Sequence, residues 1–409
     1  CTAGFSVITA NCVGNSDNQG LRRSFATQIK LSLIISALLT AVSAALLPQL
    51  LALLHITPVH GEVYSAAYSY CLVIFLGIFT QIGYNLICGI LRALGDSFSS
   101  LVFLLLSTVL NVGLDLLFLI PLRMGPMGAA IATVIAQAIS LLAGGVYTLR
   151  RYPALRPQRA DFRPDMKLAA EHLRQGIPLG LQFSILAIGI IVMQSVIVQF
   201  DTLGGEMVSN AAQNGFGAAN KLNNLLMTPL NGLGAAMTSF TAQNLGAGDH
   251  ARIKKGTVQA LIIVWTMCLI SIAAGLLLSC GGGYLYIFLS PDKVTAETMR
   301  YGNTYLYVDL SLYLFLGFIF VVRNCVQGIG KPQFVLGAGA AELVARVAVC
   351  LLLPAALAGG VVSAEAPQAA VYGLCVADPF AWMSADAVLC IPLIKNIMRE
   401  NYDLSLIHI

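Results

Sequence analysis

An acidic residue, Asp115, lies within the otherwise apolar stretch 98–122. An ionised carboxylate at the centre of a lipid bilayer costs ~2.5–3.5 kcal/mol, so an acidic residue in such a stretch is a functional candidate by default. Asn111 precedes Asp115 by four residues, which places both side chains on the same face of a helix. The pair therefore indicates a polar site inside a membrane-spanning helix.

Two hydroxyl groups are expected at the depth of this pair. At about 1.5 Å per residue, Asp115 lies roughly 10 Å, Thr133 roughly 8 Å and Tyr70 roughly 9 Å from the outer end of its own apolar stretch. A carboxylate, an amide oxygen and hydroxyls suit either a hard cation or a protonation site. The alternative is a buried hydrogen-bond network that only joins the helices.

The composition indicates a chain that crosses a membrane many times. The 409 residues are 57% apolar and only 10% charged, whereas soluble domains are about 25% charged. A helix needs about 20 apolar residues to cross the hydrocarbon core, and lipid-exposed backbone must satisfy its hydrogen bonds internally. We therefore predict an all-α integral membrane protein with ten full transmembrane helices and one partial helix. The full spans are 25–54, 64–90, 98–122, 128–149, 176–200, 211–241, 256–289, 301–326, 334–358 and 369–398, and the partial one is 1–13.

The basic residues collect on one side of these spans. Seventeen Lys and Arg residues lie in or beside the connections on that side, and only Arg123, Lys293 and Arg300 lie on the other. Because basic connections face the cytoplasm, we expect a multi-pass protein of the plasma or inner membrane with its basic loops cytoplasmic. The net charge of +4 then reflects topology and not a nucleic-acid partner. The ten cysteines show no metal-ligand spacing, so no metal centre or other cofactor is expected.

The chain contains an internal repeat. Residues 9–23 match 241–255 at an offset of 232, with Gly14 on Gly246 and Asp17 on Asp249, and residues 94–95 match 329–330 at an offset of 235. Two matches at nearly one offset indicate two copies of a large unit. Both copies of the motif face the predicted cytoplasmic side, so we expect two helical bundles related by a pseudo-twofold axis along the membrane normal. The predicted parts are an N-lobe at 1–149, a cytoplasmic interlobe linker at 150–175 and a C-lobe at 176–400.

Both ends of the chain suggest a fragment. The chain begins inside an apolar stretch, and residues 404–409 are what a common sequencing adapter gives on translation. We therefore expect 404–409 to be a non-native tail that lies outside the fold.

Four segments carry a resemblance to a known family: QNLGAGD at 243–249, LRALGDS at 91–97, LNVGLD at 110–115 and GAAIATV at 128–134. In this order and spacing they resemble the multidrug and toxic compound extrusion family of cation-coupled efflux transporters. The resemblance implies twelve helices in two lobes around a central cavity, so that the N-lobe here lacks the first helix and half of the second. It also implies that Asn111, Asp115 and Thr133 match the first-lobe coupling site, which Tyr70 matches partly through its spacing.

The predicted C-lobe carries further polar groups inside its spans. Glu342 and Arg346 are four residues apart, which favours an internal ion pair, with substrate contact as the alternative. Lys221 resembles a family position and is a candidate partner for an acidic group across the lobe. Some family members carry a cation-site carboxylate on the helix 176–200, where this chain has Gln182 and other uncharged polar residues. These four residues are the candidates for the C-lobe cavity.

The resemblance and the polar sites together predict a transporter and not an enzyme. Na+ or H+ would bind in the first lobe, and a Na+ would bind at Asp115 and Asn111. The ion would drive export of amphipathic or cationic small molecules through a rocking motion of the two lobes. A lipid-linked oligosaccharide flippase of the same superfamily is one alternative, and it would require a cationic cavity. A membrane-embedded enzyme is another, but its paired acidic motifs or His ligands are absent from the sequence. The lipid bilayer is the other expected partner, and the oligomeric state is left open.

Overall fold

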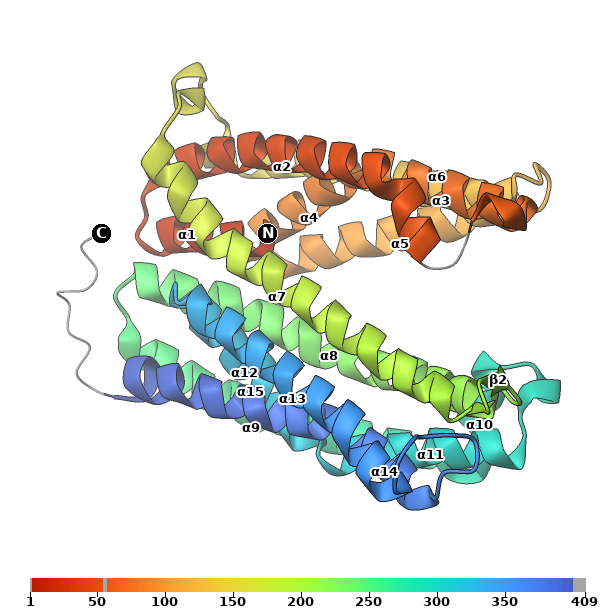
Figure 1. Cartoon of the computed structure of the whole chain (residues 1–409). Helices are drawn as coiled ribbons and strands as arrows, with labels where there is room; N and C mark the ends of the chain where they lie inside the picture. Colours follow the sequence, from red (N-terminus) through yellow and green to blue (C-terminus); the bar gives the residue numbers. More distant parts are fainter. Residues whose placement is uncertain (1, 54–56, 400–409) are drawn as a thin grey trace. The chain divides into compact units, whose positions relative to one another are not determined.

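The computed structural model of the chain describes residues 2–53 and 57–399, and the predicted tail at 404–409 lies outside them. Apart from connections, the described chain is helical except for a short hairpin of β1 (Thr202–Leu203) and β2 (Glu206–Met207) (Figure 1). The chain divides into two compact units. Unit 1 is Cys1–Gly176 with Ala242–Gly248, and unit 2 is Ile177–Thr241 with Asp249–Ile409.

The helices of the two units follow the chain in order. Unit 1 contains α1 (Thr2–Gly14), α2 (Asn18–Leu53), α3 (Glu62–Leu76), α4 (Ile78–Ala93), α5 (Ser97–Leu119), α6 (Gly125–Arg151) and the first residues of α7 (Met166–Gln199). Unit 2 contains the rest of α7, most of α8 (Ala211–Gly246), α9 (His250–Ser279), α10 (Gly283–Phe288), α11 (Ala296–Ser311), α12 (Tyr313–Gly328), α13 (Pro332–Ala358), α14 (Gln368–Cys375) and α15 (Ala377–Pro392). Short turns η1 to η6 join or extend them, the last being a π-helical turn, η6 (Leu393–Met398).

The prediction of an all-α membrane protein is confirmed, and a helix or a bent pair of helices covers each predicted span. In the described part of the chain, seven helices are long and apolar enough to cross a membrane. Two bent pairs, α3–α4 and α11–α12, raise that number to nine. The one predicted span outside these nine is 211–241, which lies in α8. This helix is 36 residues long but carries five Asn residues between 214 and 231.

The stretch 150–175, which we predicted as a linker, is partly helical. α7 begins at Met166, and only the residues before it form an irregular connection with the two turns η2 (Pro153–Leu155) and η3 (Arg159–Phe162). The apolar spacing of 176–200 located the membrane-crossing part of α7, but it gave no information about the polar turns that extend the helix ahead of it.

The matching loops of the repeat end a helix with a residue at positive φ. At the offset of 232, Ser16 and Gly248 have φ angles of 56° and 73°, and at the offset of 235, Gly95 and Gly330 have φ angles of 85° and 75°. Asp17 and Asp249 also match, and each accepts a hydrogen bond from the backbone N–H three residues later, at 2.8 Å and 2.9 Å; Asp96 does the same at 3.0 Å. The matching sequences therefore build matching turns.

Asp96 also fixes the start of α5, the helix that carries the predicted coupling residues. Its Oδ2 accepts hydrogen bonds from Tyr152 at 2.9 Å and from Tyr147 at 3.3 Å. Burial acts to raise the pKa of Asp96, but the bonds donated by Ser99, Tyr152 and Tyr147 outweigh it and hold the pKa below its usual value. The charged carboxylate thus ties the first turn of α5 to the end of α6.

Glycines at equivalent positions of the repeat let the end of α8 lie against α1 within unit 1. A Cβ on Gly14 would collide with the backbone of Gln243, and a Cβ on Gly246 would collide with the backbone of Asn11. Residues 11 and 14 correspond to 243 and 246 at the offset of 232. The contact is therefore reciprocal between matching positions of the repeat.

Candidate functional site

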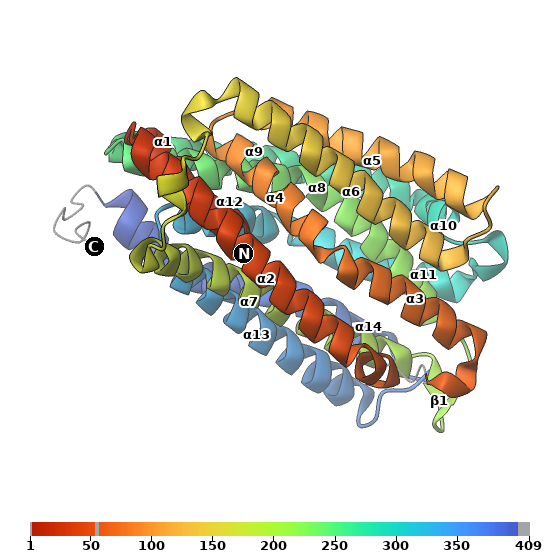
Figure 2. The same ribbon diagram turned by 90° about the horizontal axis from the view of Figure 1, so that it is seen from above.

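The first predicted site lies where α5 packs against α6 in unit 1 (Figure 2). Asn111 on α5 donates a hydrogen bond from Nδ2 to Oγ1 of Thr133 on α6, at 3.2 Å. The Thr133 hydroxyl in turn donates to the carbonyl oxygen of Ala129 at 3.0 Å. The structure thus joins two of the four predicted residues across two helices, in a bond that does not use the amide oxygen of Asn111.

Asp115 lies one helical turn beyond Asn111 on α5. Its Oδ1 atom is buried and has no hydrogen-bond partner among the described residues. A charged oxygen in this position is costly unless it gains a proton, a cation or a water molecule. The orphaned Asp115 Oδ1, with the Asn111 amide oxygen one turn away, therefore fits a proton or a small hard cation.

Tyr70, the fourth predicted residue, lies on α3 and does not join this group. Its side chain is 40% exposed, and no hydrogen bond links it to Asn111, Asp115 or Thr133 in the part of the chain that the structure describes. α3 packs against α6, so Tyr70 belongs to the neighbouring surface of the same unit. Across residues 2–53 and 57–399, no group of three or more His, Cys, Asp or Glu is placed to hold a metal ion.

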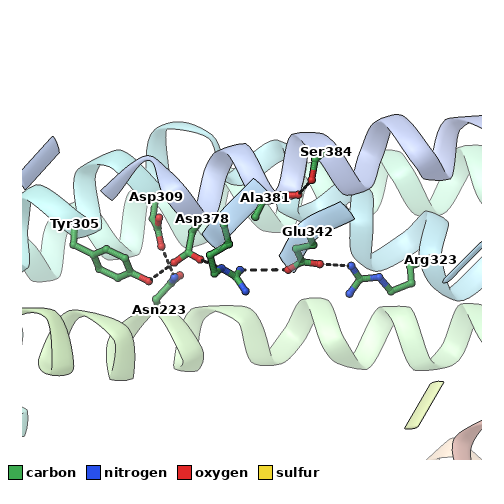
Figure 3. A network of polar contacts seen from close by, with 9 residues as sticks. Asn223, Tyr305, Asp309, Arg323, Glu342, Asp378, Ala381 and Ser384 are labelled. Atoms are coloured by element: carbon green, nitrogen blue, oxygen red, sulfur yellow. Dashed lines mark hydrogen bonds and ion pairs between the residues drawn. The ribbon is translucent and has the colours of Figure 1, made fainter. Parts of the chain in front are cut away.

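Unit 2 contains a continuous row of buried and partly buried charges (Figure 3). Arg323 on α12 contacts Glu342 on α13, with 2.7 Å between Nη2 and Oε2. The other oxygen of Glu342 lies 3.3 Å from Arg346 Nη2, and Nε of Arg346 lies 2.8 Å from Oδ1 of Asp378 on α15. At the end of this row, the hydroxyl of Tyr305 on α11 donates a hydrogen bond to Oδ2 of Asp378 at 3.0 Å. We call Arg323, Glu342, Arg346 and Asp378 the ionic row.

The ionic row extends the one contact that the sequence predicted. The Glu342–Arg346 pair expected from four-residue spacing is present. Arg323 and Asp378 are distant in sequence, and spacing alone could not bring them to this pair. The available signal was general: charges inside membrane spans are paired with one another, so each isolated charge needs a partner on another helix.

Two further carboxyl groups lie beside the row without full partners. Asp309 on α11 is fully buried; its Oδ2 accepts a hydrogen bond from Asn223 Nδ2 at 2.8 Å, and its Oδ1 has no partner among the described residues. Asp386 on α15 is 8% exposed, and both of its oxygens are buried without a partner in the same part of the chain. Sequence analysis did not single out either residue as a site.

A cavity of about 460 Å³ in unit 2 opens onto the ionic row. All four residues of the row line it, together with Tyr305 and Asn223. Amide side chains and a larger apolar set form the rest of the lining. The amides are Gln194, Asn220, Asn224 and Asn231, and the apolar side chains include Phe183, Met193, Phe216, Met227, Phe320 and Trp382. The cavity therefore combines aromatic and thioether surface with buried charge.

Of the four residues predicted for this cavity, Glu342 and Arg346 line it, but Lys221 and Gln182 do not. Lys221 is exposed, and its Nζ lies 5.9 Å from the centroid of the Phe288 ring instead of pairing with a carboxylate of the row. Gln182 is buried, with its side chain against Gly339 of α13. The direction of a side chain around its helix cannot be read from sequence position alone, and the roles of Lys221 and Gln182 stay predictions.

Solved structures confirm the fold. The chain superposes with a TM-score of 0.82 on a multidrug resistance MATE family transporter of the MOP superfamily in an outward-facing conformation, with 22% identity. That match covers 95% of this chain and 82% of the other. A MOP superfamily transporter from Pyrococcus furiosus gives a TM-score of 0.80 at 21% identity, covering 96% and 84%.

Relatives with curated names are small-molecule transporters and resistance proteins. The chain is 32% identical over 283 residues to the probable multidrug resistance protein YpnP of Bacillus subtilis, which is 66% of this chain and 57% of that protein. It is 24% identical to the FAD transporter of Shewanella oneidensis, over 66% of this chain and 56% of that protein. The chain thus spans somewhat more than half the length of these relatives.

The MatE family model matches residues 1–117 and 187–352. This chain belongs to the MatE family, the multidrug and toxic compound extrusion transporters, which are not enzymes.

Proposed function

We propose that this protein is a secondary active transporter that exports amphipathic, cationic small molecules. The observation that carries the proposal is the cavity in unit 2, where Glu342 and Asp378 lie beside aromatic and thioether side chains. A lipophilic cation suits this lining, because a carboxylate attracts its charge while rings such as Phe216 and Trp382 contact its apolar body. The names of the relatives, which refer to multidrug resistance and to FAD transport, support transport of small molecules.

We assign the coupling of export to Na+ or H+ to Asp115 in unit 1. Its orphaned oxygen needs a positive partner, and Asn111 and Thr133 offer further oxygens nearby. Binding of the ion would neutralise a charge inside the membrane, which changes the relative stability of conformations that bury or expose Asp115. Rocking of the two lobes is the motion that we propose for the exchange.

The membrane potential limits what one ion can drive. A charge that crosses the membrane is worth ~2.3 kcal/mol per 100 mV. One monovalent ion that enters in exchange for one monovalent cation cancels this electrical contribution. The concentration gradient of the ion then drives export alone, unless more than one ion enters in each cycle.

We also propose that the basic connections face the cytoplasm, as the excess of Lys and Arg on one side favours. In intact cells producing a background protein whose exposed Cys280 is replaced by serine, a membrane-impermeant thiol reagent is expected to label a cysteine introduced at Val361 and to miss one introduced at Arg159. Both positions are exposed, so the protein itself does not shield either one. Labelling after cell lysis is the control for reactivity. Labelling of position 159 alone in intact cells would reverse the proposed orientation.

The transport activity can be tested by ethidium efflux from cells that lack their own major efflux pumps. Preloaded cells producing the protein should lose ethidium faster than cells producing none. A sodium-dependent rate at constant pH identifies Na+ as the driving ion, and a rate that follows the pH gradient without sodium identifies H+. An efflux rate that depends on neither the sodium gradient nor the pH gradient would contradict secondary active transport.

A further inference from the structure

Asp386 is the charged group of unit 2 that the proposed function leaves unexplained. It is 8% exposed, and both carboxylate oxygens are buried without a hydrogen-bond partner among the described residues. An anion with no partner in such a place is held far less favourably than the neutral acid, because burial removes the water that would solvate its charge. The arrangement in this structure therefore suits a protonated Asp386.

The groups that act on Asp386 come from the two helices packed against this part of α15. α12 presents Arg323, and α13 presents Glu342. Arg323 and Glu342 already form an ion pair, with 2.7 Å between Nη2 of Arg323 and Oε2 of Glu342. The charges of this ion pair therefore act on the carboxyl group of Asp386.

Other titratable groups lie along α15 on both sides of Asp386. Asp378 is eight residues away on α15, or roughly 12 Å along the helix axis. α11 and α14 bring Tyr305, Asp309 and Cys375 to the Asp378 end, and Arg346 from α13 is paired there. On the other side of Asp386, Cys390 follows one turn later on the same helix. The turn η6 carries Lys395, which is exposed.

We propose that Asp386 is a proton-binding site that controls whether Glu342 can bind a cationic substrate. With Asp386 protonated, Arg323 stays on Glu342. When Asp386 releases its proton to water, its carboxylate attracts Arg323 away from Glu342, and Oε2 of Glu342 becomes available in the cavity. The inference rests on the proposed export of cations, because it assigns to Glu342 the role of substrate carboxylate.

The charge balance supports this exchange of partners. With Asp386 neutral, two guanidinium groups balance two carboxylates in the ionic row. Loss of one proton from Asp386 leaves a net charge of −1 beside the cavity, which one monovalent cation restores to zero. Proton and cation therefore exclude each other, which is the relation that an antiporter requires between its two substrates.

The exchange can be tested with tetraphenylphosphonium as the probe, using the protein in lipid nanodiscs and isothermal titration calorimetry. Over the pH range in which Asp386 remains protonated in the free protein, the dissociation constant should fall about tenfold per pH unit, since one proton leaves for each cation bound. Titrations in two buffers of different ionisation enthalpy should give about one proton released per cation.

Three variants separate Asp386 from other carboxylates. Asp386→Asn mimics the protonated state, so its binding should be weak, independent of pH and free of proton release. Asp292→Asn changes an exposed carboxylate in the turn η5 (Pro291–Lys293) and should behave like the wild type. Glu365→Gln changes another exposed carboxylate of unit 2 and should likewise behave like the wild type.

Infrared difference spectra give an answer even if Asp386→Asn does not fold. Addition of tetraphenylphosphonium to the wild type should remove the C=O band of one protonated carboxyl group, and an unchanged band would refute the proposal. Binding that Glu342→Gln abolishes but that does not depend on pH would overturn the proton switch and leave cation export standing. An absence of binding to the wild type at every pH would overturn both.

Discussion

Replacing Arg346 by alanine is expected to destabilise unit 2 by about 3–5 kcal/mol, because the substitution leaves two buried carboxylates without their shared partner. Glu342 and Asp378 keep less than an eighth of their side-chain surface exposed, at 7% and 12%, so water cannot replace the guanidinium. Thermal unfolding in detergent micelles, followed by tryptophan fluorescence, would measure the loss as a large fall in melting temperature.

Two controls separate the lost ion pairs from lost packing at this position. Lys395→Ala removes an exposed positive charge and should leave the melting temperature unchanged. Adding Glu342→Gln and Asp378→Asn to the Arg346→Ala protein should recover part of the loss, because both amides are neutral. If Arg346→Ala leaves the melting temperature unchanged, the ion pairs of Arg346 with Glu342 and Asp378 are not formed in the solubilised protein.

Asp115→Asn is expected to abolish ion-driven efflux while expression and binding of substrate stay close to those of the wild type. The substitution keeps the size of the side chain but removes the charge whose unpaired oxygen needs a proton or cation. Asn111→Ala should weaken coupling less, because it removes a neutral ligand instead of a charged one. Ethidium efflux under an imposed Na+ or pH gradient, corrected for the amount of protein in the membrane, is the measurement.

Thr108→Ala is a suitable control on the same helix, since the Thr108 hydroxyl bonds only to the carbonyl of Leu104 on its own helix in the described structure. It should transport at the wild-type rate. Uphill export at a normal rate by the Asp115→Asn protein would place the coupling site elsewhere. A failure of that variant to accumulate in the membrane would instead favour a role for Asp115 in packing.

The fold could be predicted because lipid imposes simple demands on a sequence. Long apolar stretches must be helical, and this requirement located a helix or bent pair at each of the ten spans. Polar extensions of helices were harder to predict, because lipid does not constrain them. α7, for example, begins ten residues before its predicted span. The bend of 56° between α11 and α12 also has no signature in the apolar pattern, which continues through it.

The candidate sites were predictable only where a single helix fixes the geometry. Asn111 with Asp115, and Glu342 with Arg346, follow from four-residue spacing. The Asn111–Thr133 bond needed in addition a correct estimate of depth, which the known rise of a helix supplied. The surroundings of Lys221, Gln182 and Tyr70 depend on the rotation of one helix against another, which residue spacing along a single helix does not determine. The roles of all these residues in coupling remain predictions for the efflux experiments.

The distribution of the ionic row over three helices bears on how the protein enters the membrane. α13 carries Glu342 and Arg346 as an internal pair, so this helix can leave the translocon with its two charges balanced. α12 carries Arg323 alone, and an unpaired arginine at the centre of a helix adds ~2.5–3.5 kcal/mol to the free energy of insertion. Because Arg323 gains its partner Glu342 only when α13 is present, release of α12 and α13 as a hairpin lowers that barrier, and Asp378 on α15 later supplies the second carboxylate of the row. The same contacts that line the cavity thus favour insertion of neighbouring helices in pairs during synthesis.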